Sequence, residues 1–180
     1  GGTADDTTGP SPCGDIFVKQ IAYVHNAVVV PPMKKVMSGQ EVSLIAYSPV
    51  AEMGTVTFTV NIVCSDTYYL WGRVLEYHPG ASVTNDPDSY YVQVDGGPES
   101  DWYYGCQTFG LLPNYHWLPV RLGPPGHACG SAERLALPLT PGLHTITLRN
   151  REGLDDLNHV AAVARILITN DPDYVAQFPD

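Results

Sequence analysis

Aromatic side chains gather in two short polar stretches near the middle of the chain. Residues 101–104 read DWYY and residues 114–117 read NYHW, so rings stand beside groups that form hydrogen bonds. Pyranose rings expose apolar C–H faces that stack on aromatic rings, and Asp, Asn and Arg bind their hydroxyl groups. The sequence therefore predicts a glycan-binding surface in loops, formed by Tyr77, Trp102, Tyr103, Tyr104, Tyr115 and Trp117. An alternative is that Tyr103, Tyr104 and Tyr115 cover one end of the fold or form a protein interface.

Motifs that would indicate catalysis are missing from the sequence. It contains no G-x-S-x-G, P-loop, H-E-x-x-H or C-x-x-C pattern, and its six histidines are scattered singly. A lone histidine on an alternating strand is usually a structural residue. We therefore expect a non-enzymatic protein without a cofactor.

Four cysteines, Cys13, Cys64, Cys106 and Cys129, lack the paired spacing of zinc sites. Disulfides explain them better, although four cysteines allow three pairings. We expect Cys13 to bond Cys64, tying the first strand to a central one, and Cys106 to bond Cys129 across a Gly/Pro-rich loop. Disulfides favour an oxidising compartment, so the protein is expected to be secreted, extracellular or at the cell surface. Four reduced, buried cysteines are the alternative.

The net charge of −10 bears on possible partners. A negative surface repels nucleic acid and anionic membranes at long range, so neither is expected as a partner. It suits a neutral partner such as a glycan. No stretch reaches the roughly 18 consecutive apolar residues of a membrane helix, so no membrane span is expected.

Short runs in which apolar and polar residues alternate predict strands, and turn residues separate them. About ten such strands predict an all-β fold, a two-sheet antiparallel β-sandwich of the jelly-roll type with an extended N-terminal segment. We expect one domain over residues 15–180, preceded by a polar tail or connector over residues 1–14. The predicted strands cover residues 16–24, 27–30, 41–47, 55–63, 68–76, 89–95, 117–122, 134–137, 143–149 and 160–169.

Several of these strands carry motifs that occur together in a known family. Residues 54–60 read GTVTFTV, 68–73 read YYLWGR and 88–95 read DSYYVQVD, followed by PGLHTI at 141–146, REG at 151–153 and ILITND at 166–171. The order of these motifs resembles the carbohydrate-binding modules of families 6 and 35. The resemblance implies a galactose-binding-like jelly roll that binds polysaccharide.

The same resemblance implies a structural Ca²⁺ between acidic residues of the first strand and an Asp near the last strand, because this cation prefers about six to eight oxygen ligands. Here Lys19 and Gln20 stand where glutamates are expected, and Ala164 stands where the family often has Asp. We therefore expect this calcium site to be lost. The Asx-Pro loops at 85–88 and 170–173 are other oxygen-rich positions, but such runs are ordinary turn formers.

The N-terminal segment predicts a second kind of function. Its polar first residues cannot bury themselves, whereas the strands that follow alternate and are suited to extending the sheet of a neighbouring copy. Repeated head to tail, this contact would build a filament of one protein. The assembly residues would be Ile16, Val18, Ile21, Tyr23, Val28 and Val30. A structural subunit that self-assembles is therefore the first hypothesis, and a secreted module that binds polysaccharide through loop Trp and Tyr residues is the alternative.

Overall fold

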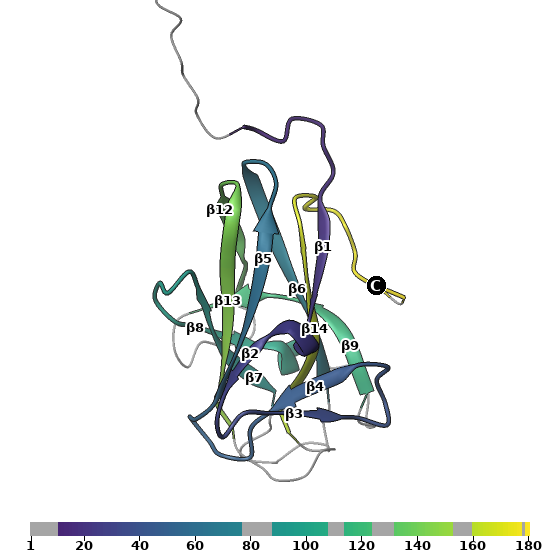
Figure 1. Ribbon diagram of the computed structural model, residues 1–180, viewed down its shortest axis with the longest axis vertical. Helices are drawn as coiled ribbons and strands as arrows, with labels where there is room; N and C mark the ends of the chain where they lie inside the picture. The colour runs from purple at the N-terminus through teal and green to yellow at the C-terminus, as the bar shows by residue number, and fades with distance from the viewer. Residues whose placement is uncertain (1–10, 77–87, 108–113, 124–131, 153–159, 178) are drawn as a thin grey trace, which may run out of the picture.

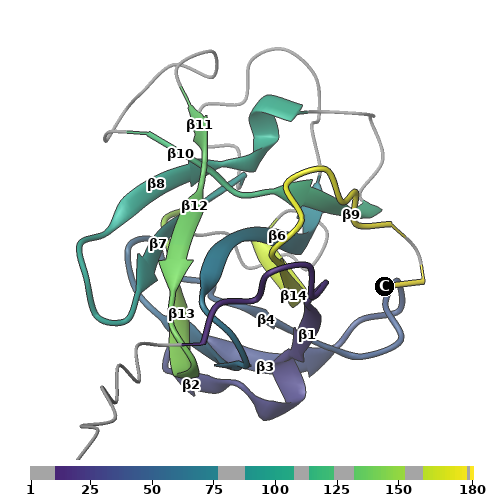
Figure 2. The same ribbon diagram turned by 90° about the horizontal axis from the view of Figure 1, so that it is seen from above.

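The computed structural model is all-β, as predicted, with two antiparallel sheets packed face to face (Figures 1 and 2). It describes residues 11–76, 88–107, 114–123, 132–152, 160–177 and 179–180. Two short 3-10 turns interrupt the strands, η1 (Val24–Asn26) and η2 (Tyr104–Gln107). The strands are β1 (Lys19–Tyr23), β2 (Val28–Val30), β3 (Lys34–Met37), β4 (Leu44–Tyr47), β5 (Thr55–Ile62), β6 (Asp66–Glu76), β7 (Ser89–Val94), β8 (Ser100–Tyr103), β9 (Asn114–Pro119), β10 (Arg121–Leu122), β11 (Glu133–Arg134), β12 (Ala136–Leu139), β13 (Gly142–Asn150) and β14 (Ala162–Thr169).

The larger sheet has seven strands in the order β12-β6-β14-β4-β3, with β1 beside β14 and β9 beside β6. The smaller sheet has five strands in the order β2-β5-β13-β7-β8. Strands β10 and β11 form a separate two-stranded ribbon near β8 (Figure 2). The sequence pattern had not predicted β3 and β8, which are only four residues long.

The core lies between the sheets and follows the alternation of each strand. In β5, Val56, Phe58 and Val60 are buried, while the threonines between them face outward. In β6, Gly72 leaves room for the ring of Trp102, because a Cβ at this glycine would lie 2.5 Å from Trp102 Cη2. Gly72 is the glycine of the YYLWGR motif, and it therefore lets the indole ring of Trp102 pack directly against the backbone of β6, a central strand of its sheet.

The outer face of the seven-stranded sheet is also largely buried, which explains why every residue of β14 is buried. Ala176 in the C-terminal segment packs against Trp71, Trp117 and Leu167. Glu41 covers the same face, and its side chain is 3% exposed.

Glu41 binds two arginines of this face. One carboxylate oxygen lies 2.9 Å from Arg73 Nε and the other lies 2.9 Å from Arg165 Nη1. Arg165 also donates to the backbone oxygen of Asp180 at 2.6 Å and 3.0 Å. The side chains of Glu41 and Arg165 are buried and that of Arg73 is partly exposed, and Arg165 ties the C-terminal segment to the sheet.

The N-terminal strands lie in the sheets of their own chain, an arrangement that gives no support to the expectation that they extend the sheet of a neighbour. Strand β1 pairs with β14 over its whole length, and β2 pairs with Thr55 to Thr57 of β5. A strand already paired in its own sheet leaves only its other edge for a partner.

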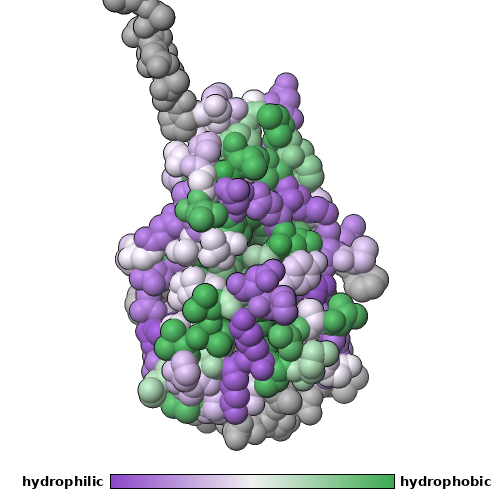
Figure 3. Space-filling model, viewed as in Figure 1, coloured by the Kyte–Doolittle hydropathy of each residue, from purple (hydrophilic) through white to green (hydrophobic). Residues whose placement is uncertain are grey.

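The six predicted assembly residues are placed differently from one another. Val18 is buried in the core, and Ile21 packs on the outer face of the seven-stranded sheet. The remaining four are exposed: Ile16, Tyr23, Val28 and Val30. On the side of the molecule seen in Figure 3, hydrophobic groups are interrupted by hydrophilic ones. The six residues therefore do not share one face, and their role in assembly stays a prediction.

A disulfide joins Cys13 to Cys64, as predicted. The phenol of Tyr68 lies beside it, 3.3 Å from Cys13 Sγ, and donates to the backbone oxygen of Cys64 at 2.7 Å. Cys129 and residues 1–10 of the predicted tail lie outside the described residues, so the pairing of Cys106 with Cys129 stays a prediction. None of the described helical segments has the length and apolar character needed to cross a membrane.

Candidate functional site

Trp102 and Tyr104 are core residues, so the prediction that they lie in solvent-exposed loops is wrong. Both are 0% exposed, and their ring centroids are 5.2 Å apart. Residues 100–103 form β8 instead of a loop, so alternation turns Trp102 toward the opposite sheet. Neither ring can stack on a sugar in this fold.

Tyr115 and Trp117 are also buried, at 6% and 8% exposure, which contradicts the same prediction. They lie on β9 and point to the outer face of the seven-stranded sheet, where other segments cover them. Tyr115 packs beside Tyr47, and Trp117 packs beside Trp71. Tyr77, the remaining ring, lies outside the described residues.

Tyr103 is the one predicted residue in the described chain whose ring stays partly exposed. It lies at the end of β8 and faces away from the core. Three further half-exposed side chains surround it on the outer side of the five-stranded sheet. We call this set the Arg–Tyr face; it consists of Tyr91, Tyr103, Arg149 and Arg151.

Tyr91 of β7 and Arg149 of β13 are direct neighbours in the sheet register. The guanidinium carbon of Arg149 lies 4.0 Å from the ring centroid of Tyr91, a cation–π contact. Arg149 also binds Glu99 at 2.7 Å and Glu52 at 3.2 Å, and the Tyr91 hydroxyl donates to Glu52 at 3.0 Å. The hydrogen bond with Glu99 is the largest cause that raises the pKa of Arg149. These contacts fix the Tyr91 ring and the guanidinium side by side.

Arg151 and Tyr103 repeat this arrangement one step further along the sheet. The guanidinium carbon lies 4.4 Å from the ring centroid of Tyr103, and Arg151 Nη1 donates to Ser89 Oγ at 3.1 Å. The same Nη1 forms an ion pair with Glu152 at 3.2 Å. Two tyrosine rings, each against an arginine, therefore lie on adjoining strands.

Glu152 is the titratable group at the base of this face. Its side chain is 11% exposed, Ser89 Oγ donates to Oε1, and Oε2 is buried without a hydrogen-bond partner. Burial is the main cause that raises the pKa of Glu152 to about 7, and the negative charge of Asp88 raises it further. The carboxyl group therefore changes charge near neutral pH, next to Arg151.

The Arg–Tyr face combines apolar ring surface with fixed donors and acceptors. Burial is the largest cause that raises the pKa of both tyrosines, so their hydroxyls stay protonated. Rings, hydroxyls, guanidinium groups and carboxylates in one place can contact both the C–H faces and the hydroxyls of a sugar. The sequence analysis missed Tyr91 because its position in an alternating strand does not distinguish it from the other residues of that strand.

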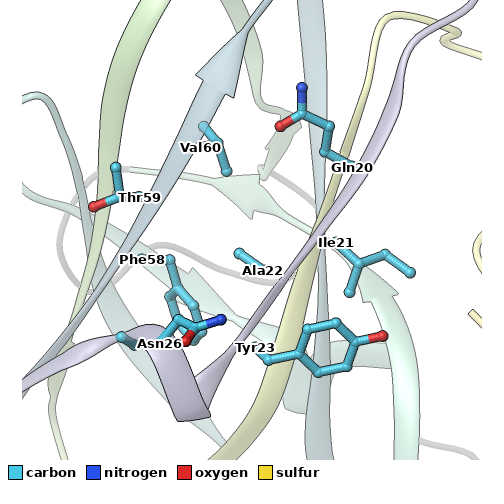
Figure 4. A pocket seen from close by; sticks show the side chains of 9 residues that line it. Gln20, Ile21, Ala22, Tyr23, Asn26, Phe58, Thr59 and Val60 are labelled. Atoms are coloured by element: carbon cyan, nitrogen blue, oxygen red, sulfur yellow. The ribbon is translucent and has the colours of Figure 1, made fainter.

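A small pocket opens between β1 and β5, at the side of the sandwich (Figure 4). Ala22 and Asn26 lie toward it, whereas Ile21 and Tyr23 project to the other side of β1. Its volume is about 130 Å³, below the roughly 300 Å³ at which ligand pockets usually begin. The pocket can hold water or one small group, but not a sugar chain.

The positions that replace the expected calcium ligands have other contacts here. Lys19 Nζ lies 2.8 Å from Asp180 and 3.2 Å from the hydroxyl of Tyr174. Gln20 donates to the backbone oxygen of Asn61, and Ala164 is buried in β14. Across the described ranges, no three His, Cys, Asp or Glu side chains are placed to hold a metal ion.

Comparison with solved structures shows the fold. The chain is similar to a family 35 carbohydrate-binding module from Clostridium thermocellum, with a TM-score of 0.52, 12% identity, and 84% of this chain and 97% of that one covered. It is similar to the family 35 module of Abf62 from Cellvibrio japonicus, with a TM-score of 0.51, 10% identity, and coverage of 84% and 92%. The third similarity is to a Podospora anserina β-(1,4)-mannanase that contains such a module, with a TM-score of 0.55, 14% identity, and coverage of 89% of this chain and 29% of that one.

The fold is therefore that of family 35 carbohydrate-binding modules, as the sequence motifs indicated. No protein-family model matches the chain, and no curated protein matches it.

Proposed function

We propose that this protein is a non-enzymatic carbohydrate-binding module and that it binds polysaccharide through the Arg–Tyr face. The observation that carries the proposal is the pair of half-exposed tyrosine rings, Tyr91 and Tyr103, each fixed against an arginine. Aromatic rings beside fixed polar groups are the usual means of binding a sugar ring. The jelly-roll fold shared with family 35 modules supports the same function.

We further propose that the protein works in an extracytoplasmic compartment. The disulfide between Cys13 and Cys64 supports this, because disulfides persist where the environment is oxidising. Self-assembly into a filament is not part of the proposal, because β1 and β2 are paired within their own chain.

Affinity electrophoresis tests the proposed function. The wild-type protein is run in native gels containing neutral polysaccharides, among them β-1,4-mannan, and compared with the variant Tyr103→Ala. We expect at least one polysaccharide to retard the wild type, and Tyr103→Ala to weaken that binding by about tenfold, because a lost ring contact is worth about 1.4 kcal/mol.

Tyr23→Ala is the matched control, because Tyr23 is an exposed tyrosine on the other sheet, at 42% exposure. It should be retarded as strongly as the wild type. Equal loss in both variants, or a wild type that no neutral polysaccharide retards, would rule out the Arg–Tyr face as the binding site.

A further inference from the structure

Arg121 and Arg134 stand directly opposite each other in the ribbon of β10 and β11 (Figure 2). Opposite residues of an antiparallel pair project to the same side, with Cβ atoms about 4.5–5.5 Å apart, and like charges there destabilise the pair. Desolvation lowers the pKa of Arg134, and the charge of Arg121 lowers it further. The ribbon therefore holds two cations together at an energetic cost.

No carboxylate of the described chain forms an ion pair with either arginine. The other four arginines of the protein all form ion pairs: Arg73 and Arg165 with Glu41, Arg149 with Glu99 and Glu52, and Arg151 with Glu152. The chain has 19 acidic residues against nine basic ones, so carboxylates are plentiful. Glu133 is the neighbour of Arg134 in β11, but alternation directs its side chain to the other face. Among the six arginines, these two are the ones that have no carboxylate partner in the described part of the chain.

Arg134 also carries buried donors without acceptors. Its Nε and Nη2 are buried and make no hydrogen bond, and its Cζ lies 4.8 Å from the ring centroid of Trp71. The indole Nε1 of Trp71 is likewise buried without a partner. Buried donors are normally paired, and each unpaired one costs about 1–3 kcal/mol. The two charges favour an anionic acceptor, and the unpaired donors show that the described chain does not itself supply one to Arg134.

We propose that Arg121 and Arg134 form an oxyanion-binding site and that its ligand is a sulfate ester carried on a polysaccharide. A sulfate ester presents three terminal oxygens, so it can accept hydrogen bonds from both guanidinium groups at once, whereas a carboxylate presents two. The ribbon adjoins β8, since Asp101 and Gly123 exchange backbone hydrogen bonds at 3.3 Å and 3.2 Å. The ribbon therefore joins β8 through its backbone, whereas the Arg134 side chain lies over the rings of Tyr69 and Trp71 in β6 of the seven-stranded sheet. The choice of a polysaccharide as carrier rests on the proposed function.

Binding to dextran sulfate tests the site. The wild type is compared with the double variant Arg121→Gln/Arg134→Gln in affinity electrophoresis, with neutral dextran and polygalacturonate as the other matrices. We expect dextran sulfate to retard the wild type, and the double variant to bind it at least about tenfold more weakly. The charge-matched control is Lys34→Gln/Lys35→Gln, which removes two cations from β3 and should bind like the wild type.

Each outcome decides a separate point. Equal weakening in both double variants would mean that only net charge matters and would overturn the site. Stronger retardation by polygalacturonate than by dextran sulfate would overturn the assignment of sulfate. The site and the Arg–Tyr face fail independently, because the arginine double variant should keep its retardation by neutral polysaccharide while Tyr103→Ala loses it.

A stability measurement separates a binding role of Arg134 from a structural one. In sulfate-free chloride buffer, Arg134→Met should have a Tm equal to or above that of the wild type, because it removes a desolvated charge that lacks a partner. If the contact of Arg134 with Trp71 and Tyr69 were its purpose, the Tm would fall. A lower Tm together with unchanged binding to dextran sulfate would refute the proposal.

Discussion

At the scale of single residues, Glu152 is a group whose charge changes near neutral pH. It is buried among the groups that support the Arg–Tyr face, and burial raises its pKa to about 7. An acid whose pKa is higher in the folded state than in the unfolded state binds more protons when folded. Its contribution to stability is therefore complete below the unfolded pKa of about 4.5 and is lost as the pH rises through about 7.

Glu152→Gln should remove this part of the pH dependence. Each unit between the folded and unfolded pKa is worth about 1.4 kcal/mol, so the wild type should lose on the order of 3 kcal/mol of unfolding free energy relative to the variant between about pH 4.5 and about pH 8. Urea unfolding across this range measures the difference. Glu133→Gln, at an exposed position, should run parallel to the wild type. If the unfolding free energy of Glu152→Gln also changed with pH in parallel with that of the wild type, Glu152 would have an ordinary pKa.

At the scale of the elements, β8 and β9 decide which aromatic residues reach solvent. Both segments contain acidic, amide or imidazole side chains among their aromatic rings, and such a mixed composition is typical of loops. Their backbone pairing shows that both segments are strands, because β8 pairs with β7 and β9 pairs with β6. A ring in a strand faces the side that the pleat imposes, so Trp102 and Tyr103 point in opposite directions although they are adjacent.

Gly72→Ala tests the close approach of β6 and β8. The added Cβ would lie 2.5 Å from a rigid, fully buried indole, so the sheets must separate or Trp102 must move. We expect a loss of about 1–3 kcal/mol in unfolding free energy, the usual cost of overpacking a core. Gly39→Ala is the control, because nothing lies within 4 Å of its added Cβ. Equal stability of the two variants would contradict the packing described for Trp102.

At the scale of the whole molecule, the N-terminal region and the C-terminal segment are both held against the strands of the sandwich. Residues before β1 are held to the start of β6 by the disulfide and by backbone hydrogen bonds of Cys13 and Ser65. The C-terminal segment is held to β14 by Arg165 and to β1 by Lys19. The fold therefore uses both ends of the described chain.

Cys13→Ala/Cys64→Ala should lower stability by about 2–5 kcal/mol, because a cross-link over 51 residues restricts the unfolded chain. Thermal unfolding under non-reducing conditions measures this and leaves any bond between Cys106 and Cys129 in place. Added reductant should lower the Tm of the wild type but should change the double variant only through that second pair. An unchanged Tm in the double variant would show that the cross-link does not stabilise the fold.

The sequence by itself determined the all-β fold and the strands with clear alternation, because both depend on local periodicity. Its four cysteines indicated disulfides but left three pairings open, and the structure shows the bond between Cys13 and Cys64. The sequence also carried the motifs of a family whose fold the protein shares. What it could not determine was which outward faces meet water. Trp117 and Tyr91 both face away from the core, but segments distant in sequence bury the first and leave the second half exposed. Only the tertiary structure moved the candidate sugar-binding residues from Trp102 and Tyr104 to Tyr91, Arg149 and Arg151 around Tyr103, because coverage by distant segments leaves no periodic signal in the strand itself.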